Sequence, residues 1–290
     1  MSILKGPRET WDLSSIILYY EVFEVKILLG EISMFRYSIL CYIINGYEDV
    51  KEVLQKDPNA EYILVTDDKN LTSNTWNVIY DESLNALPST FDKCYAIRFN
   101  VFKYCHSPIC VYIDGNVQVN KSLAPLIDKF EDGKYDMCLM PHPLRTNFVS
   151  EYNAWITQRN YPIEQAKKFF KLLNDSHYPT NYKGFFQGTF KIVRNDKTNS
   201  DFERLSIAFM KYLGTEDSIE RLDQTVYSFV LNNWFYDKKI LPVSEQILRS
   251  DYMTWFWHKS NNKNMNIFYD INKPDIKWMF NKQVECMYLK

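Results

Sequence analysis

The chain has 290 residues, and 46% of them are hydrophobic, which is enough to fill a core and excludes a mainly disordered protein. Its 34 Lys and Arg against 36 Asp and Glu leave a net charge of −2, whereas a general nucleic-acid-binding protein carries a basic surplus, so we expect no nucleic-acid partner. Aromatic residues reach 16%, which suits core filling or a site where rings stack on a flat ligand.

Short apolar runs that end in turn residues predict strands, and amphipathic or capped stretches predict helices. In chain order we predict a helix at Ser14–Leu29, a strand at Tyr37–Ile44, a helix at Tyr47–Gln55, strands at Tyr62–Val65 and Trp76–Tyr80, a helix at Phe91–Tyr104, a strand at Cys110–Ile113, a helix at Leu123–Phe130, a strand at Asp136–Met140, helices at Glu151–Arg159 and Ile163–Asn174, a strand at Phe185–Val193, and helices from a capping box at Ser200 and Glu203 to Leu213 and over Glu216–Asn233. This alternation predicts an α/β fold with a mostly parallel sheet flanked by helices.

We expect one main domain with an addition at each end. We predict a helical N-terminal extension in residues 1–33, the α/β domain in residues 34–250, and an aromatic-rich segment around Trp255-Phe256-Trp257 in residues 251–290. Glu21, Glu24 and Lys26 interrupt the apolar stretch near the N-terminus, so we expect no transmembrane segment. Six cysteines without a CxxC pair predict free thiols in a reducing compartment, hence a cytoplasmic protein or one at the periphery of a membrane.

Val111–Asn116 carries the strongest indication of chemistry. The apolar strand delivers Asp114 and Asn116 at its carboxyl end, where open α/β sheets bind ligands. Two side-chain oxygens two residues apart could reach one cation, and such ligands suit Mg²⁺ or Mn²⁺ held against a diphosphate. A plain Asp-Gly-Asn turn is the alternative interpretation.

In its context this segment resembles the Asp-x-Asp signature of GT-A-fold glycosyltransferases, with Asn in the last place. The resemblance is to the glycosyltransferase-like family of plant mucilage-related proteins and their bacterial relatives, over roughly residues 37–235. It rests on Arg98 with Lys103, the Ile113–Asn116 strand end, His142–Arg145 followed by Glu151, and Arg221-x-Asp223-Gln224.

A second resemblance is to glycogenin and the retaining galactosyltransferases. Phe185–Gly188 is similar to their "YFNSG" strand, and Asp223-Gln224-Thr225 to their "DQD". His258-Lys259 resembles part of their "HFxGxxKPW" motif, although the Gly and the Pro-Trp pair do not follow at the family's spacing.

These resemblances imply a glycosyltransferase of GT-A fold that takes a nucleotide-diphospho-sugar, a UDP-sugar by default, and a carbohydrate or glycoconjugate acceptor. They imply a Mn²⁺ or Mg²⁺ cofactor held by Asp114, Asn116 and His258. The implied nucleotide-sugar-binding residues are Arg98, Asp114, Asn116, His142, Arg145, Gln224 and Lys259.

Two residues are candidates for catalysis. Asp223 would be the general base of an inverting reaction, and Gln187 would lie against the sugar in a retaining one. We favour retention, because Gln187 and Asp223-Gln224 fall where the retaining family places its pocket residues.

Two other functions remain as alternatives. A nucleotidyltransferase of similar fold usually opens with a glycine-rich, basic loop after its first strand, whereas residues 45–49 here are acidic. A non-catalytic carbohydrate-binding protein would keep the aromatic rings and a degenerate Asp-x-Asn site, and would not hydrolyse a nucleotide sugar.

Overall fold

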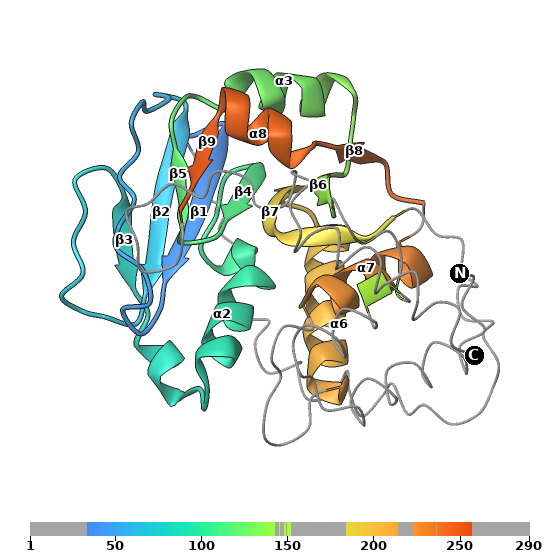
Figure 1. The fold of residues 1–290 in the computed structure, drawn as a ribbon, viewed down its shortest axis with the longest axis horizontal. Coiled ribbons are helices and arrows are strands. Elements are labelled where there is room, and N and C mark those ends of the chain that lie inside the picture. Colours follow the sequence, from blue (N-terminus) through green and yellow to red (C-terminus); the bar gives the residue numbers. More distant parts are fainter. Residues whose placement is uncertain are drawn as a thin grey trace, which may run out of the picture. The chain divides into compact units, whose positions relative to one another are not determined.

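The computed structural model describes residues 34–142, 145, 148, 150–151, 184–213, 223–235 and 237–256 (Figure 1). Its main sheet has the strand order β3-β2-β1-β4-β7-β6-β8, and a second sheet pairs β5 with β9. The strands are β1 Tyr37–Ile43, β2 Ala60–Thr66, β3 Asn77–Tyr80, β4 Ile109–Ile113, β5 Val117–Val119, β6 Met137–Pro141, β7 Phe186–Arg194, β8 Ile240–Pro242 and β9 Met253–Trp255. The helices are α2 Thr90–Arg98, α3 Ala124–Asp132, α6 Lys197–Leu213, α7 Asp223–Trp234 and α8 Glu245–Asp251, with 3₁₀ turns η2 Glu82–Ala86 and η3 Val101–Lys103.

All strands of the main sheet except β7 run in the same direction. The pairs β3–β2, β2–β1, β1–β4 and β6–β8 are parallel, whereas β7 is antiparallel to both β4 and β6. The carboxyl ends of the parallel strands therefore lie at one edge, together with the amino end of β7. This mixed α/β sheet flanked by helices confirms the predicted fold class and is consistent with a Rossmann-like GT-A fold.

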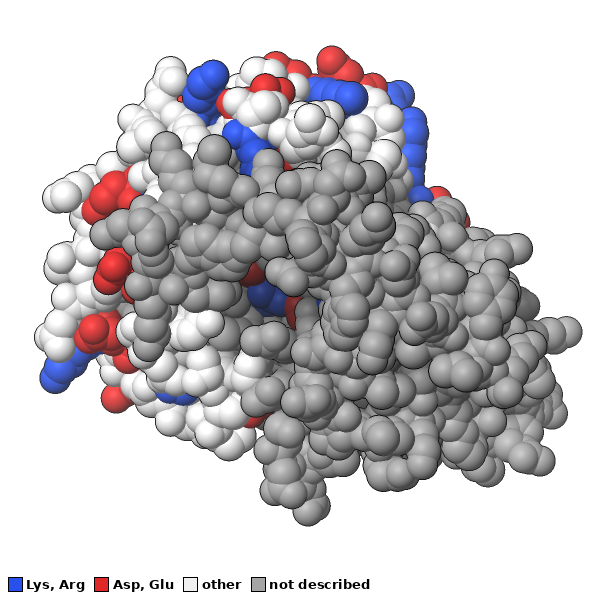
Figure 2. Space-filling model, in the orientation of Figure 1, with Lys and Arg blue, Asp and Glu red and all other residues white. Residues whose placement is uncertain are grey.

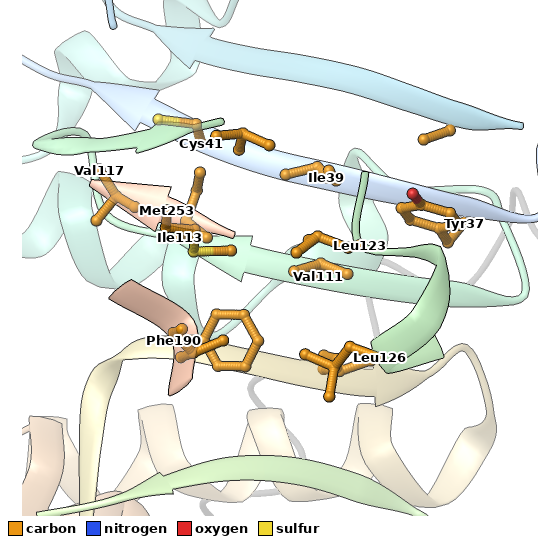
Figure 3. Packing of buried hydrophobic residues seen from close by; sticks show 14 of the residues in the cluster. Tyr37, Ile39, Cys41, Val111, Ile113, Val117, Leu123, Leu126, Phe190 and Met253 are labelled. Carbon is orange, nitrogen blue, oxygen red and sulfur yellow. The ribbon is translucent and has the colours of Figure 1, made fainter. Parts of the chain in front are cut away.

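The sheet separates two hydrophobic cores. Residues that alternate along one strand face opposite sides, so Leu40 belongs to the core beneath α2, α6 and α7, while Ile39 and Cys41 belong to the core beneath α3 and α8. Figure 3 shows part of the second core, where Leu123 lies beside Val111 of β4 and Leu126 lies over β7. Burial on both faces explains why these strands are continuous apolar runs.

The helix predicted for Tyr47–Gln55 is wrong. This segment is irregular, because other parts of the chain take its backbone groups. Val53 N donates to Thr75 Oγ1 at 2.9 Å and Leu54 N to Val119 O at 2.9 Å, while Lys51 O accepts from Trp76 Nε1 at 3.0 Å. Long-range partners thus replace the hydrogen bonds that a helix would make.

The helix predicted for Phe91–Tyr104 ends early, at Arg98. Arg98 O accepts from Lys191 Nζ at 2.7 Å, and Val101 N donates to Glu203 Oε2 at 3.1 Å. The same contacts explain why Ser200 and Glu203 form no capping box: α6 begins at Lys197, and Glu203 is buried beneath η3 instead. Asp196 supplies the cap, since its Oδ1 accepts from Asn199 N at 2.8 Å.

Several predictions fall outside the described residues. They concern residues 1–33, most of Glu151–Arg159, and Ile163–Asn174. Within the described ranges, no helix combines the length and apolar character needed to cross a membrane. The five cysteines that the structure describes carry free thiols.

Candidate functional site

Arg98 joins two carboxylates at the edge of the sheet where the parallel strands end. Its Nη2 donates to Asp114 Oδ1 at 2.7 Å, and its Nη1 forms an ion pair with Asp223 Oδ2. The Arg98, Asp114 and Asp223 side chains are only 12%, 16% and 9% exposed, so this is a largely buried ion triad. The structure thereby brings together residues from three separate parts of the sequence.

Each member of the triad reaches this place through its own element. Arg98 is the last residue of α2, whose start is fixed by Ser89 Oγ accepting from Asp92 N at 3.1 Å. Asp114 follows β4 directly. Asp223 is the first residue of α7, where a carboxylate is favoured by the helix dipole. Although it begins a helix, Asp223 is not a surface residue, because only 9% of its side chain is exposed.

Two tyrosine hydroxyls complete the polar network. Arg98 Nε donates to Tyr112 Oη at 2.9 Å, and Tyr112 Oη donates to Asp114 Oδ1 at 2.7 Å. Tyr42 lies beside them, with its hydroxyl 3.3 Å from Arg98 Nη2. The sequence analysis did not identify these tyrosines, although Tyr112 and Asp114 stand two residues apart, a spacing that puts both on the same face of the strand.

The environment fixes the protonation of this network. Burial would lower the pKa of Arg98, but the charge of Asp114 raises it well above its ordinary value. Burial raises the pKa of Tyr112 and of Tyr42 well above the ordinary value. The guanidinium thus stays charged and both hydroxyls stay protonated at neutral pH.

The turn after β4 needs glycine between Asp114 and Asn116. A Cβ on Gly115 would stand 2.4 Å from Tyr42 O, which is backbone and cannot move aside cheaply. Asn116 then attaches the turn to the end of β9. Its side-chain Nδ2 donates to Phe256 O at 2.9 Å, and its backbone carbonyl accepts from Phe256 N at 2.9 Å. Part of the Asn116 side chain is therefore used in holding the turn.

Gln187 and Gly188 lie on β7 against the ion triad. They line a very small cavity together with Arg98 and Asp223. A Cβ on Gly188 would stand 2.6 Å from Asp223 Oδ2 and 3.0 Å from Arg98 Nη1. Gln187 Nε2 donates to Glu245 Oε2 at 3.3 Å. The strand therefore approaches the triad closely only because position 188 has no side chain.

Gln224, next to Asp223, is half-buried. Its Oε1 is buried and accepts no hydrogen bond within the described part of the chain.

A second buried ion pair, Lys191 with Glu203, contacts the backbone of Arg98. Lys191 Nζ donates to Glu203 Oε1 at 2.5 Å and also binds Arg98 O at the end of α2. Burial raises the pKa of Glu203, whereas the charge of Lys191 opposes that shift. The sequence analysis missed this pair, because it assigned Glu203 to a helix cap.

His142 and Arg145 lie elsewhere, on a larger cavity of about 450 Å³ beside β6 and β8. His142 follows β6, and its Nδ1 accepts from Arg145 N at 3.1 Å. Arg145 Nη1 lies 2.6 Å from Glu151 Oε2 in a buried ion pair. Those predicted nucleotide-sugar-binding residues that the structure describes thus divide into two groups, and neither His142 nor Arg145 is among the described partners of the triad.

The described residues offer two oxygen-bearing side chains for the expected cation, Asp114 and Asn116. Carboxylate and amide oxygens are the right chemistry for Mg²⁺ or Mn²⁺. The described ranges contain no group of three or more His, Cys, Asp and Glu that could hold a metal ion. His258, the expected third ligand, and Lys259 lie outside those ranges.

Charges of both signs are mixed over the face drawn in Figure 2. Basic and acidic side chains lie together near its centre, and both kinds occur along the edge that carries α3 and α8. The face shows no extended basic patch in its described part.

No protein-family model matches this chain, and no curated protein matches it. Among solved structures, mouse xyloside xylosyltransferase 1 in its apo form is similar over 71% of this chain and 84% of that chain, with a TM-score of 0.40 and 10% sequence identity.

Proposed function

We propose that this protein is a glycosyltransferase that moves a sugar from a nucleotide-diphospho-sugar, a UDP-sugar by default, to a hydroxyl group of a carbohydrate or glycoconjugate acceptor. The observation that carries the proposal is the ion triad. Its three residues belong to the segments on which the sequence resemblance rests, and they meet at the ligand-binding edge of an α/β sheet.

Arg98 has the properties that the departure of a nucleoside diphosphate requires. The leaving group gains negative charge as the glycosidic bond breaks, and a fixed, desolvated cation stabilises that charge. The pKa of Arg98 lies well above its ordinary value, so the guanidinium remains charged. Bound at Asp114 and Asn116, Mn²⁺ or Mg²⁺ would add further neutralisation of the diphosphate.

Asp223 is better suited to orientation than to proton removal. A carboxylate that is ion-paired with a guanidinium is a weaker base, because the pair stabilises its charged form. Gln187, which also lines this small cavity, is the candidate group for the sugar face. This arrangement supports a retaining reaction in which Asp223 holds Arg98 and the donor.

Donor binding is the direct test of this function. A matching nucleotide sugar, added with Mn²⁺ at ~100 times its dissociation constant, should stabilise the fold by about 2.7 kcal/mol in a thermal-shift assay. Asp114→Asn should abolish the Mn²⁺-dependent part of the shift, since it removes the negative charge and keeps the shape. Asp128→Asn on α3 is the matched control, because that carboxylate is exposed.

The absence of any shift or hydrolysis across a panel of UDP-, GDP-, ADP- and dTDP-sugars would contradict the function. Binding without hydrolysis or transfer would favour a carbohydrate-binding protein.

The anomeric configuration of the product tests the roles of Gln187 and Asp223. We expect the product to keep the donor's configuration in the NMR signal of its anomeric proton, and we expect Gln187→Ala to reduce transfer more than Asp223→Asn does. An inverted product would instead make Asp223 the general base, whose loss should cost ~10²–10⁴-fold in rate.

A further inference from the structure

The cavity beside β6 and β8 has the size of a ligand site. Its volume of about 450 Å³ falls in the usual range for small-molecule pockets, roughly 300–1,000 Å³. Phe185, Phe186 and Ile240 contribute apolar surface, and a proline stands at the end of each bordering strand. Aromatic rings and other apolar surfaces of this kind pack against the C–H faces of sugar rings.

The charged and imidazole side chains that line this cavity are hydrogen-bond donors. Arg145 and Lys238 can only donate. His142 Nδ1 accepts from Arg145 N, so the neutral ring carries its proton on Nε2, and that nitrogen is a donor and not an acceptor. None of the described lining residues is acidic.

Arg145 shows that this donor set is incompletely satisfied. The residue is buried, and its Nε has no hydrogen-bond partner among the described residues. Its Nη1 is paired with Glu151, and Lys238 Nζ lies 3.7 Å from Asp136 Oδ1. Leaving a buried donor unpaired costs about 1–3 kcal/mol. Nε itself is shielded, so a ligand in the cavity would bind Arg145 through the terminal nitrogens of its guanidinium.

The cavity borders the ion triad along β7. Phe186 belongs to the core beneath α2, α6 and α7 and lines the cavity, and Gly188, which faces Arg98 and Asp223 from the same side of the sheet, lines the small cavity. A ligand in the larger cavity would therefore lie beside the place where the proposed function puts the reacting sugar.

We propose that this cavity binds the acceptor and that the acceptor carries an anionic group, a phosphate monoester or a carboxylate, held by Arg145, Lys238 and His142. The inference rests on the proposed function, because calling the ligand an acceptor assumes that the protein transfers a sugar. A group that only accepts hydrogen bonds matches side chains that only donate, whereas a neutral hydroxyl would use one donor and leave its own proton without a side-chain acceptor.

The test compares sugars that differ only in charge. Binding of glucose, glucose 6-phosphate and glucuronic acid to the full chain is measured by calorimetry, and the same three forms are used for galactose and mannose. We expect at least one anionic sugar to bind ten or more times tighter than its neutral parent. Whether the phosphate or the carboxylate form binds more tightly shows which anionic group the cavity prefers.

Two neighbouring lysines supply the variant and its control. Lys238→Gln should weaken binding of the anionic sugar about tenfold, because it removes one cation from the cavity. Lys239→Gln should leave that binding unchanged, since Lys239 Nζ donates to Gly133 O at 2.5 Å and the residue does not line the cavity. Both substitutions remove one positive charge, so a difference between them cannot come from net charge.

The result that overturns the inference is equal binding of neutral and anionic sugars, no binding of any of them, or equal effects of the two substitutions. A failure of the proposed function looks different: the chain would bind anionic sugars through Lys238 and yet neither bind nor hydrolyse a nucleotide sugar.

Discussion

Arg98 shows how one side chain can organise a site. Its guanidinium contacts Tyr112 and Asp114 at the end of β4 and Asp223 at the start of α7. Removal of one partner from a buried ion pair typically costs 3–5 kcal/mol, because the other charge stays buried. The triad is therefore stable only as a whole, and the shape of the surrounding backbone decides whether it can form.

Gly188 offers a test of that dependence. Gly188→Ala adds a methyl group 2.6 Å from Asp223 Oδ2, so the carboxylate must move away from Arg98. We expect a loss of about 1–3 kcal/mol in the free energy of unfolding, the usual cost of overpacking, and a large loss of donor binding. Urea unfolding and the donor thermal-shift assay measure the two effects.

The Asp223→Ala background provides the control for this variant. There the added methyl group no longer meets the carboxylate, so Gly188→Ala should cost clearly less than it does in the original chain. Equal costs in the two backgrounds would show that the glycine serves the strand and not the triad.

Among the elements, the two 3₁₀ turns depend on one carboxylate. Asp81 caps η2 by accepting from Ser83 N at 3.0 Å, and its Oδ2 accepts from Lys103 Nζ at 2.5 Å and Tyr104 Oη at 2.7 Å, at the end of η3. Burial would raise the pKa of Asp81, but these hydrogen bonds lower it to about 2.

Asp81→Asn should therefore destabilise the fold in a pH-dependent way. The folded chain binds this proton less tightly than the unfolded chain, so the contribution is full above the ordinary pKa of 3.8 and is lost as the pH falls towards 2. We expect about 1 kcal/mol at pH 7, since the exposed Lys103 is screened by solvent. Urea unfolding at pH 7, 4 and 3 should show the difference shrinking, and a constant difference would contradict it.

Local patterns predicted the long elements because their signals lie within a few residues. The apolar runs of β1 and β4 and the cap of α2 are such signals. β5 is different: its three residues are a strand only because β9 pairs with them more than 130 residues later. The helix prediction for residues 47–55 was wrong for the same reason, since their hydrogen bonds go to distant segments.

The candidate site also has a part that local patterns predict and a part that only the fold reveals. Arg98, Asp114 and Asp223 carry recognisable local motifs, and the sequence identified them as candidates. Their meeting in one ion triad depends on where α2, β4 and α7 end in space, which no local pattern contains. Lys191 and Glu203 carry no motif at all, and only the fold shows that they hold the end of α2.

At the scale of the molecule, both cores depend on the same strands. Ile39 faces one core and Leu40 the other, so loss of packing on either side weakens β1. Ile127→Ala in α3 and Leu231→Ala in α7 should each cost about 2–5 kcal/mol. Both should shift a single unfolding transition, followed by tryptophan fluorescence and by far-ultraviolet circular dichroism.

Separate transitions for the two probes would show that the cores unfold independently. A control in the exposed Asp128 should leave the midpoint nearly unchanged.

The position of β7 has a consequence for synthesis on the ribosome. β7 lies between β4 and β6, yet it follows both in the chain, so the centre of the sheet stays open until residue 194 has emerged. A nascent chain that stops before residue 186 presents β4 with one edge unpaired, and every residue of β4 is buried in the finished protein. An apolar unpaired edge is a template for aggregation. The interval between the synthesis of β4 and that of β7 is thus when this chain most needs a chaperone, and the ion triad can form only after that interval has ended.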